Sequence, residues 1–131
     1  MNETEARAKE IALAFERRRI RQAMGEEAVS QIREIGEGGG YEILSPDGRT
    51  IEVKGTKGTK PNYGFVINSL QETQHLENGG FIYRVTDVFG TTPHIYILSR
   101  GHLSIRTRYR ADVRIRRDAE HEIIVHEATV V

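Results

Sequence analysis

Two acids and a lysine stand close together where the sequence predicts neighbouring β-strands: Glu42, Glu52 and Lys54. Glu52 and Lys54 belong to the alternating segment Ile-Glu-Val-Lys, so in a strand their side chains leave one face while the apolar side chains leave the other. Glu42 lies on an apolar strand predicted at 41–44, and the Ser-Pro-Asp-Gly sequence at 45–48 is typical of a turn that folds two strands together. We therefore expect the three charged groups to converge at a sheet.

These residue types suit phosphodiester hydrolysis. A divalent metal such as Mg²⁺ or Mn²⁺ accepts carboxylate ligands and retains several waters, so few protein ligands are needed. Glu42 and Glu52 are the predicted metal ligands, and Lys54 is predicted to position water or to stabilise charge in the transition state. Charged residues alternating with Ile and Val also describe an ordinary half-solvated strand, so the tetrapeptide alone does not establish a site.

The pattern resembles that of the PD-(D/E)XK nuclease superfamily, in which Glu52-Val53-Lys54 would be the (D/E)XK element. It is more similar still to the nuclease-like domain family of unknown function named after the C-terminal part of the plant protein NO VEIN. That signature runs roughly G-Y-D-I-x-S and then I-E-V-K, and this chain has Gly-Tyr-Glu-Ile-Leu-Ser at 40–45, with Glu42 where aspartate is usual. The resemblance covers about residues 5–99 and continues through the segments Gly64–Asn68, Gln71–Glu72 and Phe81–Val85.

The resemblance implies a restriction-endonuclease-like domain that hydrolyses DNA with Mg²⁺ or Mn²⁺, in restriction or defence. It adds the backbone carbonyl of Val53 to the two carboxylates as a metal ligand. It also implies an acid from the first helix and a polar residue from the helix after the core strands. The preferred candidates for these two positions are Glu10 and Gln71, and the alternatives are Glu16 and Glu72.

Composition is compatible with one domain over residues 1–131, with a family-like core at 5–99 and an extension at 100–131. The chain has 131 residues, of which 37% are hydrophobic, and it contains no cysteine, so a disulfide framework or a cysteine-ligated zinc is excluded. No apolar run approaches the roughly 20 residues that span a bilayer, so we expect a cytoplasmic protein without a membrane partner. Nineteen basic residues balance nineteen acidic ones, so net charge does not indicate a nucleic-acid partner.

The predicted fold is α+β or α/β, with a mixed central sheet flanked by helices and a C-terminal β-hairpin. Apolar residues at helical spacing predict a helix over 4–24 with Thr4 as its N-cap, and a shorter helix over 26–35. Ser69 is expected to cap a helix that continues to about Leu76. Further strands are predicted at 65–68, 81–88 and 95–98.

Residues 105–115 alternate so regularly that one long strand is predicted, with the segment 122–131 pairing against it. The arginines of this strand are spaced like successive phosphates of one nucleic-acid strand and are predicted to contact them. Two lysines of the glycine-rich loop at 55–64 are also predicted to contact phosphates. These predicted nucleic-acid-binding residues are Arg106, Arg108, Arg110, Lys57 and Lys60. The alternative is a solvated outer face that keeps the hairpin soluble, with acidic residues paired across it.

Three hypotheses about function follow. The first is a metal-dependent nuclease acting on DNA, with RNA left as an alternative substrate. The second is a non-catalytic nucleic-acid-binding module, suggested by glutamate at position 42 and by the short chain. The third is a protein-interaction domain that assembles through the edge of its terminal hairpin, and a homodimer is left open. The sequence has no P-loop, no His-Glu-x-x-His zinc motif and no Gly-x-Ser-x-Gly elbow.

Overall fold

The computed structural model describes residues 2–36, 39–62, 65–67, 70–107 and 111–128. Helices and strands mix along the chain, which confirms the predicted α+β class, whereas the likeness to restriction endonucleases stays a prediction. The helices are α1 Glu3–Met24, α2 Glu26–Val29 and α3 Leu70–Glu77, with 3₁₀ turns η1 Arg100–His102 and η2 Arg117–Glu122. The strands are β1 Arg33–Glu34, β2 Ile43–Leu44, β3 Thr50–Gly55, β4 Val66–Ile67, β5 Phe81–Thr86, β6 His94–Leu98, β7 Leu103–Thr107, β8 Ala111–Ile115 and β9 Ile124–Glu127.

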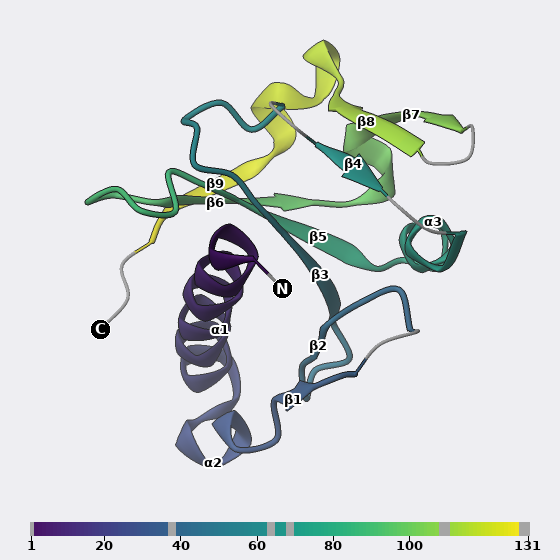
Figure 1. The fold of residues 1–131 in the computed structure, drawn as a ribbon. Coiled ribbons are helices and arrows are strands. Elements are labelled where there is room, and N and C mark those ends of the chain that lie inside the picture. The colour runs from purple at the N-terminus through teal and green to yellow at the C-terminus, as the bar shows by residue number, and fades with distance from the viewer. Residues whose placement is uncertain (1, 37–38, 63–64, 68–69, 108–110, 129–131) are drawn as a thin grey trace.

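Two sheets organise these strands. The six-stranded sheet has the order β1-β2-β3-β5-β6-β9, and the three-stranded sheet has the order β4-β8-β7. β3 and β5 are parallel, and the other neighbouring pairs are antiparallel. Because α3 lies in the connection between parallel strands, it crosses one face of the large sheet, while α1 covers the other face (Figure 1). The large sheet is therefore a middle layer.

α1 begins one residue earlier than expected and packs against the large sheet. Asn2 is its N-cap, because its side chain accepts a hydrogen bond from the Glu5 N–H at 2.8 Å, so the prediction that Thr4 caps the helix is wrong. Its buried face includes Ala8 and Ile11 and contacts the apolar side of β3. Among the helices formed by described residues, none is both long and apolar enough to cross a membrane.

The opposite face of the large sheet carries a second apolar cluster and the charged side of β3. Ile82 of β5 packs there with Leu76 of α3 and with Val113 of β8. Parallel neighbours in register project from the same face, and Glu52 lies beside Ile82 while Lys54 lies beside Arg84. The two predicted site residues of β3 therefore face the α3 side of the molecule. The apolar side chains between them face α1, as the alternation predicted.

The second predicted helix, over 26–35, is mostly wrong. α2 ends at Val29, and residues 33–34 form β1. The Ile35 N–H donates to the carbonyl of Glu42 at 2.8 Å, so the backbone bonds across to the next segment instead of along a helix. Pairing with a neighbouring strand outweighs the helical spacing of the apolar residues here.

The C-terminal third also differs from the prediction. The alternating segment 105–115 forms two strands, β7 and β8, which pair antiparallel with Ile105 opposite Val113. Within the predicted partner segment 122–131, the described strand β9 pairs with β6 of the large sheet and not with β7 or β8, and β8 pairs with β4. β7 and β8 thus form a hairpin that joins β4 in the small sheet, while β9 adds a strand to the large sheet. The Ser69 cap lies outside the described residues.

Candidate active site

The hairpin of β2 and β3 brings Glu42 and Glu52 together. Ile43 pairs with Ile51, and the Glu42 N–H donates to the Ile51 carbonyl at 2.8 Å, which extends the pairing past the end of β2. Glu42 therefore lies beside the start of β3, and its carboxyl group shares a hydrogen bond with that of Glu52. A hydrogen bond between two carboxyl groups requires one of them to be protonated. The expected convergence of these side chains is confirmed, whereas their role as metal ligands stays a prediction.

Glu52 is held in its protonated form. The residue is 8% exposed. Burial raises the pKa of its carboxyl group to about 9, with the hydrogen bond and the negative charge of Glu42 as the next causes and Lys54 acting in the opposite direction. A carboxyl group whose pKa is raised beside a second carboxyl group is a place where a divalent cation could replace the proton.

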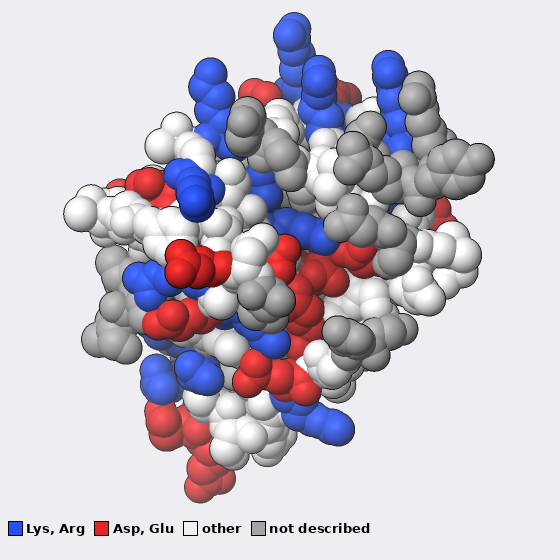
Figure 2. All heavy atoms as spheres, viewed as in Figure 1, with Lys and Arg blue, Asp and Glu red and all other residues white. Residues whose placement is uncertain are grey.

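Lys54 completes the cluster and is paired with an acid from α3. Its ammonium nitrogen lies 2.5 Å from a carboxylate oxygen of Glu72, with 19% and 12% of the two side chains exposed. Glu72 was the alternative to Gln71 in the sequence, and it is Glu72 that contacts Lys54, while Gln71 is exposed and lines a separate hollow. Figure 2 shows acidic side chains gathered at the middle of this face, between α1 and α3.

Lys9 of α1 contacts Glu42 of the candidate site, and the sequence analysis did not predict this contact. Its ammonium nitrogen lies 3.1 Å from a carboxylate oxygen of Glu34 and 3.9 Å from one of Glu42, and 19% of its side chain is exposed. Lys9 falls at helical spacing from the buried residues Leu13 and Ile20. That spacing was a signal that the lysine points toward the sheet and not into solvent.

Two side chains of the candidate site, Glu42 and Glu52, could act as metal ligands. Among the described residues there is no group of three or more histidine or acidic side chains arranged to hold an ion. Glu42 and Glu52 could supply two carboxylate oxygens, and the Val53 carbonyl is the third predicted ligand. Because Mg²⁺ commonly retains several waters and takes further oxygens from a phosphate substrate, this donor set suits Mg²⁺ or Mn²⁺ better than a metal that needs a closed protein cage.

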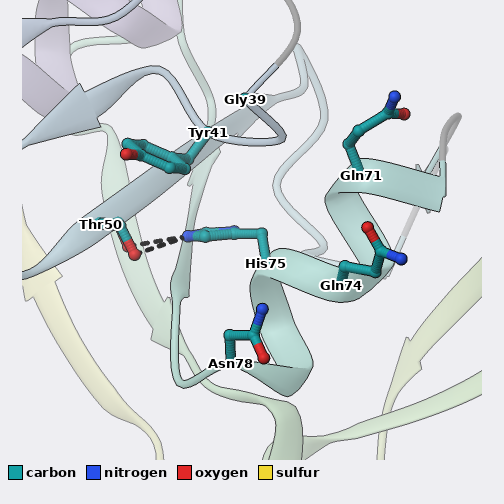
Figure 3. Close-up of a pocket in the computed structure, with 7 residues that line it drawn as sticks. All are labelled: Gly39, Tyr41, Thr50, Gln71, Gln74, His75 and Asn78. Carbon is teal, nitrogen blue, oxygen red and sulfur yellow. Dashed lines mark hydrogen bonds between the residues drawn. The ribbon is translucent and has the colours of Figure 1, made fainter.

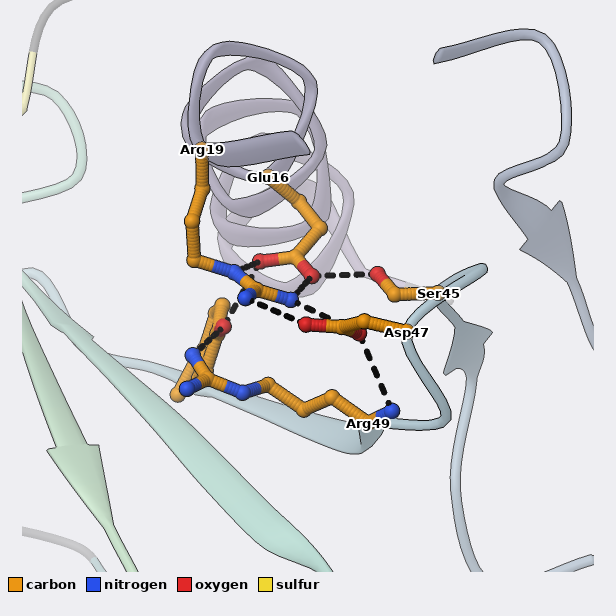
Figure 4. Close-up of polar contacts among 6 residues, drawn as sticks. Glu16, Arg19, Ser45, Asp47 and Arg49 are labelled. Atoms are coloured by element: carbon orange, nitrogen blue, oxygen red, sulfur yellow. Dashed lines mark hydrogen bonds and ion pairs between the residues drawn. The ribbon is translucent and has the colours of Figure 1, made fainter. Parts of the chain in front are cut away.

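The first-helix candidates lie in other contacts. Glu10, with 57% of its side chain exposed, pairs with Arg7 at 3.1 Å and lines a hollow on the α1 side of the molecule. Glu16 is fully buried and belongs to a separate polar network (Figure 4). Among the described residues, the ion pair of Glu10 and the hydrogen bonds of Glu16 are made with residues other than Glu42 and Glu52.

The polar network around Glu16 fastens α1 to the β2–β3 turn and to β5. Glu16 accepts hydrogen bonds from Arg19 at 2.5 and 2.9 Å, from the Tyr83 hydroxyl at 2.6 Å and from the Ser45 hydroxyl. Arg19 also donates to Asp47 at 2.7 Å. Burial alone would raise the pKa of Glu16, but these hydrogen bonds and the charge of Arg19 hold it below its ordinary value. The network thus fixes the hairpin that carries the candidate site.

The predicted nucleic-acid contacts are separated by the fold. Lys57 lies over the Phe89 ring, 5.9 Å from its centre, and Lys60 lines a hollow beside β6 and β9. Arg106 is exposed on β7. Because the chain folds back between β7 and β8, the predicted single line of arginines along one strand is wrong. Arg108 and Arg110 lie outside the described residues.

Arg84 anchors the loop that follows β3. It is 1% exposed and donates to the carbonyls of Gly55 at 3.1 Å and Pro61 at 2.8 Å, with its guanidinium 4.8 Å from the Phe65 ring centre. Burial lowers the pKa of Arg84 to about 10. The arginine therefore remains charged at neutral pH and ties both ends of the loop to β5.

Comparisons with protein-family models, with curated proteins and with solved structures find no match to this chain.

Proposed function

We propose that the chain is a metal-dependent nuclease domain that hydrolyses phosphodiester bonds in DNA, in restriction or defence. The observation that carries the proposal is the pairing of the Glu42 and Glu52 carboxyl groups on the face of the sheet that also carries Lys54. An acid pair with an adjacent ammonium group is the minimal set for holding a divalent cation against a phosphate. The absence of cysteine agrees with a protein that works in the cytoplasm.

Each residue of the site would have a different role in hydrolysis. Glu42, Glu52 and the Val53 carbonyl would hold Mg²⁺ or Mn²⁺, which when bound supplies charge neutralisation at the phosphate and a more acidic water. Lys54 would place its positive charge against the phosphate oxygens or hold a water by hydrogen bonding. Glu72, 2.5 Å from Lys54, fixes the position of the ammonium group.

The test is a cleavage assay on single- and double-stranded DNA and RNA with Mg²⁺ or Mn²⁺. We expect cleavage of DNA that stops in EDTA and is absent from Glu52→Gln protein prepared in parallel. Glu77→Gln is the matched control, because Glu77 is an exposed acid at the end of α3. Equal cleavage by the wild type and by Glu52→Gln would reject the proposal, since it would place the activity at another site or in a contaminant.

Glu10→Gln provides a second comparison. If the residue acts in catalysis, as the sequence predicts, this variant loses activity. If it serves only its ion pair with Arg7, the variant cleaves like the Glu77→Gln control.

A non-catalytic nucleic-acid-binding module is the second candidate. It is favoured by the small donor set, since no third acidic or histidine side chain among the described residues joins the carboxyl pair as a ligand group. In that case the wild type would bind DNA in a salt-dependent manner without cleaving it in either metal.

A further inference from the structure

A second hollow adjoins the carboxyl pair, on the same side of the large sheet. It has a volume of about 400 Å³, within the range of small-molecule sites. Seven described residues line it, and we call it the α3 pocket (Figure 3): Gly39, Tyr41, Thr50, Gln71, Gln74, His75 and Asn78.

The α3 pocket is connected to the candidate active site through the backbone. Tyr41 precedes Glu42, and Thr50 lies two residues before Glu52 on β3. On α3, Gln71 precedes Glu72, which contacts Lys54. Three elements that carry the charged groups thus also carry the walls of the pocket. A ligand in the pocket would therefore contact residues that lie within two positions of Glu42, Glu52 and Glu72 in the chain.

The lining combines uncharged hydrogen-bonding groups with an aromatic wall. Gln71, Gln74 and Asn78 follow one face of α3, are exposed, and each offers both a donor and an acceptor. None of the seven lining residues is lysine, arginine, aspartate or glutamate. Such a lining does not suit a phosphate or a carboxylate. It suits a flat, uncharged heterocycle that carries donors and acceptors on its edge.

The aromatic wall is held rigidly. The Tyr41 and His75 rings are stacked with their centres 5.1 Å apart and their planes at 29° (Figure 3). The His75 ring nitrogen Nε2 lies 2.9 Å from the Thr50 hydroxyl, which links α3 to β3. A Cβ on Gly80 would come within 1.9 Å of that same nitrogen, so only glycine lets the chain after α3 pass the ring.

The opposite lip of the pocket is fixed by another glycine. Gly40 has a φ of +77°, which glycine adopts without strain, and a Cβ there would lie 2.3 Å from the carbonyl oxygen of Gln71. The segment that leads to Tyr41 therefore packs directly on the start of α3. The pocket is formed before any ligand binds, which reduces the entropy that binding must overcome.

We propose that the α3 pocket binds one unpaired nucleobase of the nucleic acid whose phosphate lies at Glu42 and Glu52. This inference rests on the proposed function and narrows its substrate class, because a base inside a duplex cannot enter a closed pocket without leaving its stack. The amide groups of α3 contact the edge of the base, and the aromatic wall packs against its plane. The domain consequently prefers single-stranded DNA, or duplex ends and mismatches, over intact duplex.

The first experiment uses cleavage of an end-labelled single-stranded DNA of mixed sequence with Mn²⁺. Gln74→Ala/Asn78→Ala removes two exposed amides, and Glu77→Gln is the control on the same helix. We expect the double variant to raise KM about tenfold with kcat changed less than about twofold, and to flatten the base preference of the cleavage ladder, because the recognition of one base edge contributes a factor of at least that order. An unchanged KM and ladder would overturn the pocket proposal while leaving the nuclease proposal intact.

The second experiment is independent of cleavage. Adenosine, cytidine, guanosine and thymidine are titrated separately into metal-free protein, and the side-chain amide signals of Gln71, Gln74 and Asn78 are followed by NMR. Saturable shifts that Tyr41→Leu weakens, in a protein that cleaves nothing, would support the pocket and reject the nuclease. No shift with any nucleoside, together with no cleavage, would overturn both.

Discussion

Two buried glutamates of this protein have opposite electrostatic environments. Glu16 is fully buried on α1, and Glu52 is 8% exposed on β3. Glu16 accepts hydrogen bonds from Arg19, Ser45 and Tyr83, and its pKa lies below the ordinary value. Glu52 shares a hydrogen bond with another carboxyl group, and its pKa is raised to about 9.

The difference separates a structural acid from a candidate functional one. A buried carboxylate whose donors all come from the protein is already satisfied, and its charge is balanced within the fold. A carboxyl pair whose buried member favours its protonated form is not satisfied as a carboxylate in this way, and a cation could take the place of that proton. Glu16 and Glu52 are the same residue type and are both buried. Their different hydrogen-bond partners therefore determine which one is structural and which one is a candidate for function.

The largest expected effect is on activity at Glu52. Because the proposed function assigns a metal ligand to this residue, Glu52→Gln should lower the rate of DNA cleavage by about a thousandfold, equivalent to roughly 4 kcal/mol. The variant should nevertheless fold, since a neutral amide resembles the protonated acid. Cleavage rates test the predicted loss of activity, and circular dichroism spectra test whether the variant folds. An unfolded Glu52→Gln protein would show that Glu52, like Glu16, is needed for the structure.

The reverse is expected at Glu16. Glu16→Gln leaves Arg19 without its buried counter-charge and should lower the free energy of unfolding by about 3 kcal/mol, as for other broken buried ion pairs. Urea denaturation of the wild type and the variant at pH 7 provides the measurement. A loss below about 1 kcal/mol would mean that the network contributes little to holding the β2–β3 turn.

A smaller effect is expected at Lys54. Lys54→Met keeps the apolar stem and removes the charge, so cleavage should fall about a hundredfold, or roughly 2.7 kcal/mol, while Mn²⁺ affinity changes little. The single variant removes the Lys54 ammonium group from the half-buried Glu72, so Lys54→Met/Glu72→Gln serves as the control for stability. Isothermal calorimetry with Mn²⁺ separates the two roles. A Mn²⁺ affinity that falls as far as in Glu52→Gln would assign Lys54 to the metal site itself.

The smallest expected effect is the dependence of stability on pH. Between about pH 5 and pH 9 folded Glu52 keeps a proton that the unfolded chain has released, so its contribution to stability is present at low pH and is lost as the pH rises. In EDTA, the free energy of unfolding of Glu52→Gln minus that of the wild type should therefore grow by about 1 kcal/mol or more from pH 5 to pH 8. A difference that stays constant, or that shrinks with pH, would show that Glu52 is ionised like Glu16.

Local pattern accounts for part of the fold. The turn sequence at 45–48 and the flanking apolar residues correctly paired β2 with β3, because both signals act within a short stretch of chain. The alternation over 105–115 was misread as one strand. In the hairpin, the backbone register pairs position 106 with 112 and position 105 with 113, so residues of the same parity stay on one face after the chain reverses. A period of two therefore does not reveal the reversal.

Only some residues of the candidate site could be predicted from the sequence. Glu42, Glu52 and Lys54 were found from strand alternation, whereas the contact of Glu72 with Lys54 joins two elements and could only be offered as an alternative to Gln71. Lys9 was missed because the helix that carries it was treated as a source of acids. Contacts between distant elements depend on how α1 and α3 lie across the sheet.

The sequence by itself determined which side chains share a face of β3, since strand geometry places residues two apart on the same side. It also determined which reactive groups are present: the candidate site can use carboxylates and a lysine, and the chain has no cysteine thiol. Only the tertiary structure decided which buried glutamate is ionised. A pKa depends on burial and on neighbouring charges, and those neighbours come from other segments of the chain: Ser45 and Tyr83 donate to Glu16, whereas burial and the neighbouring Glu42 carboxyl group raise the pKa of Glu52.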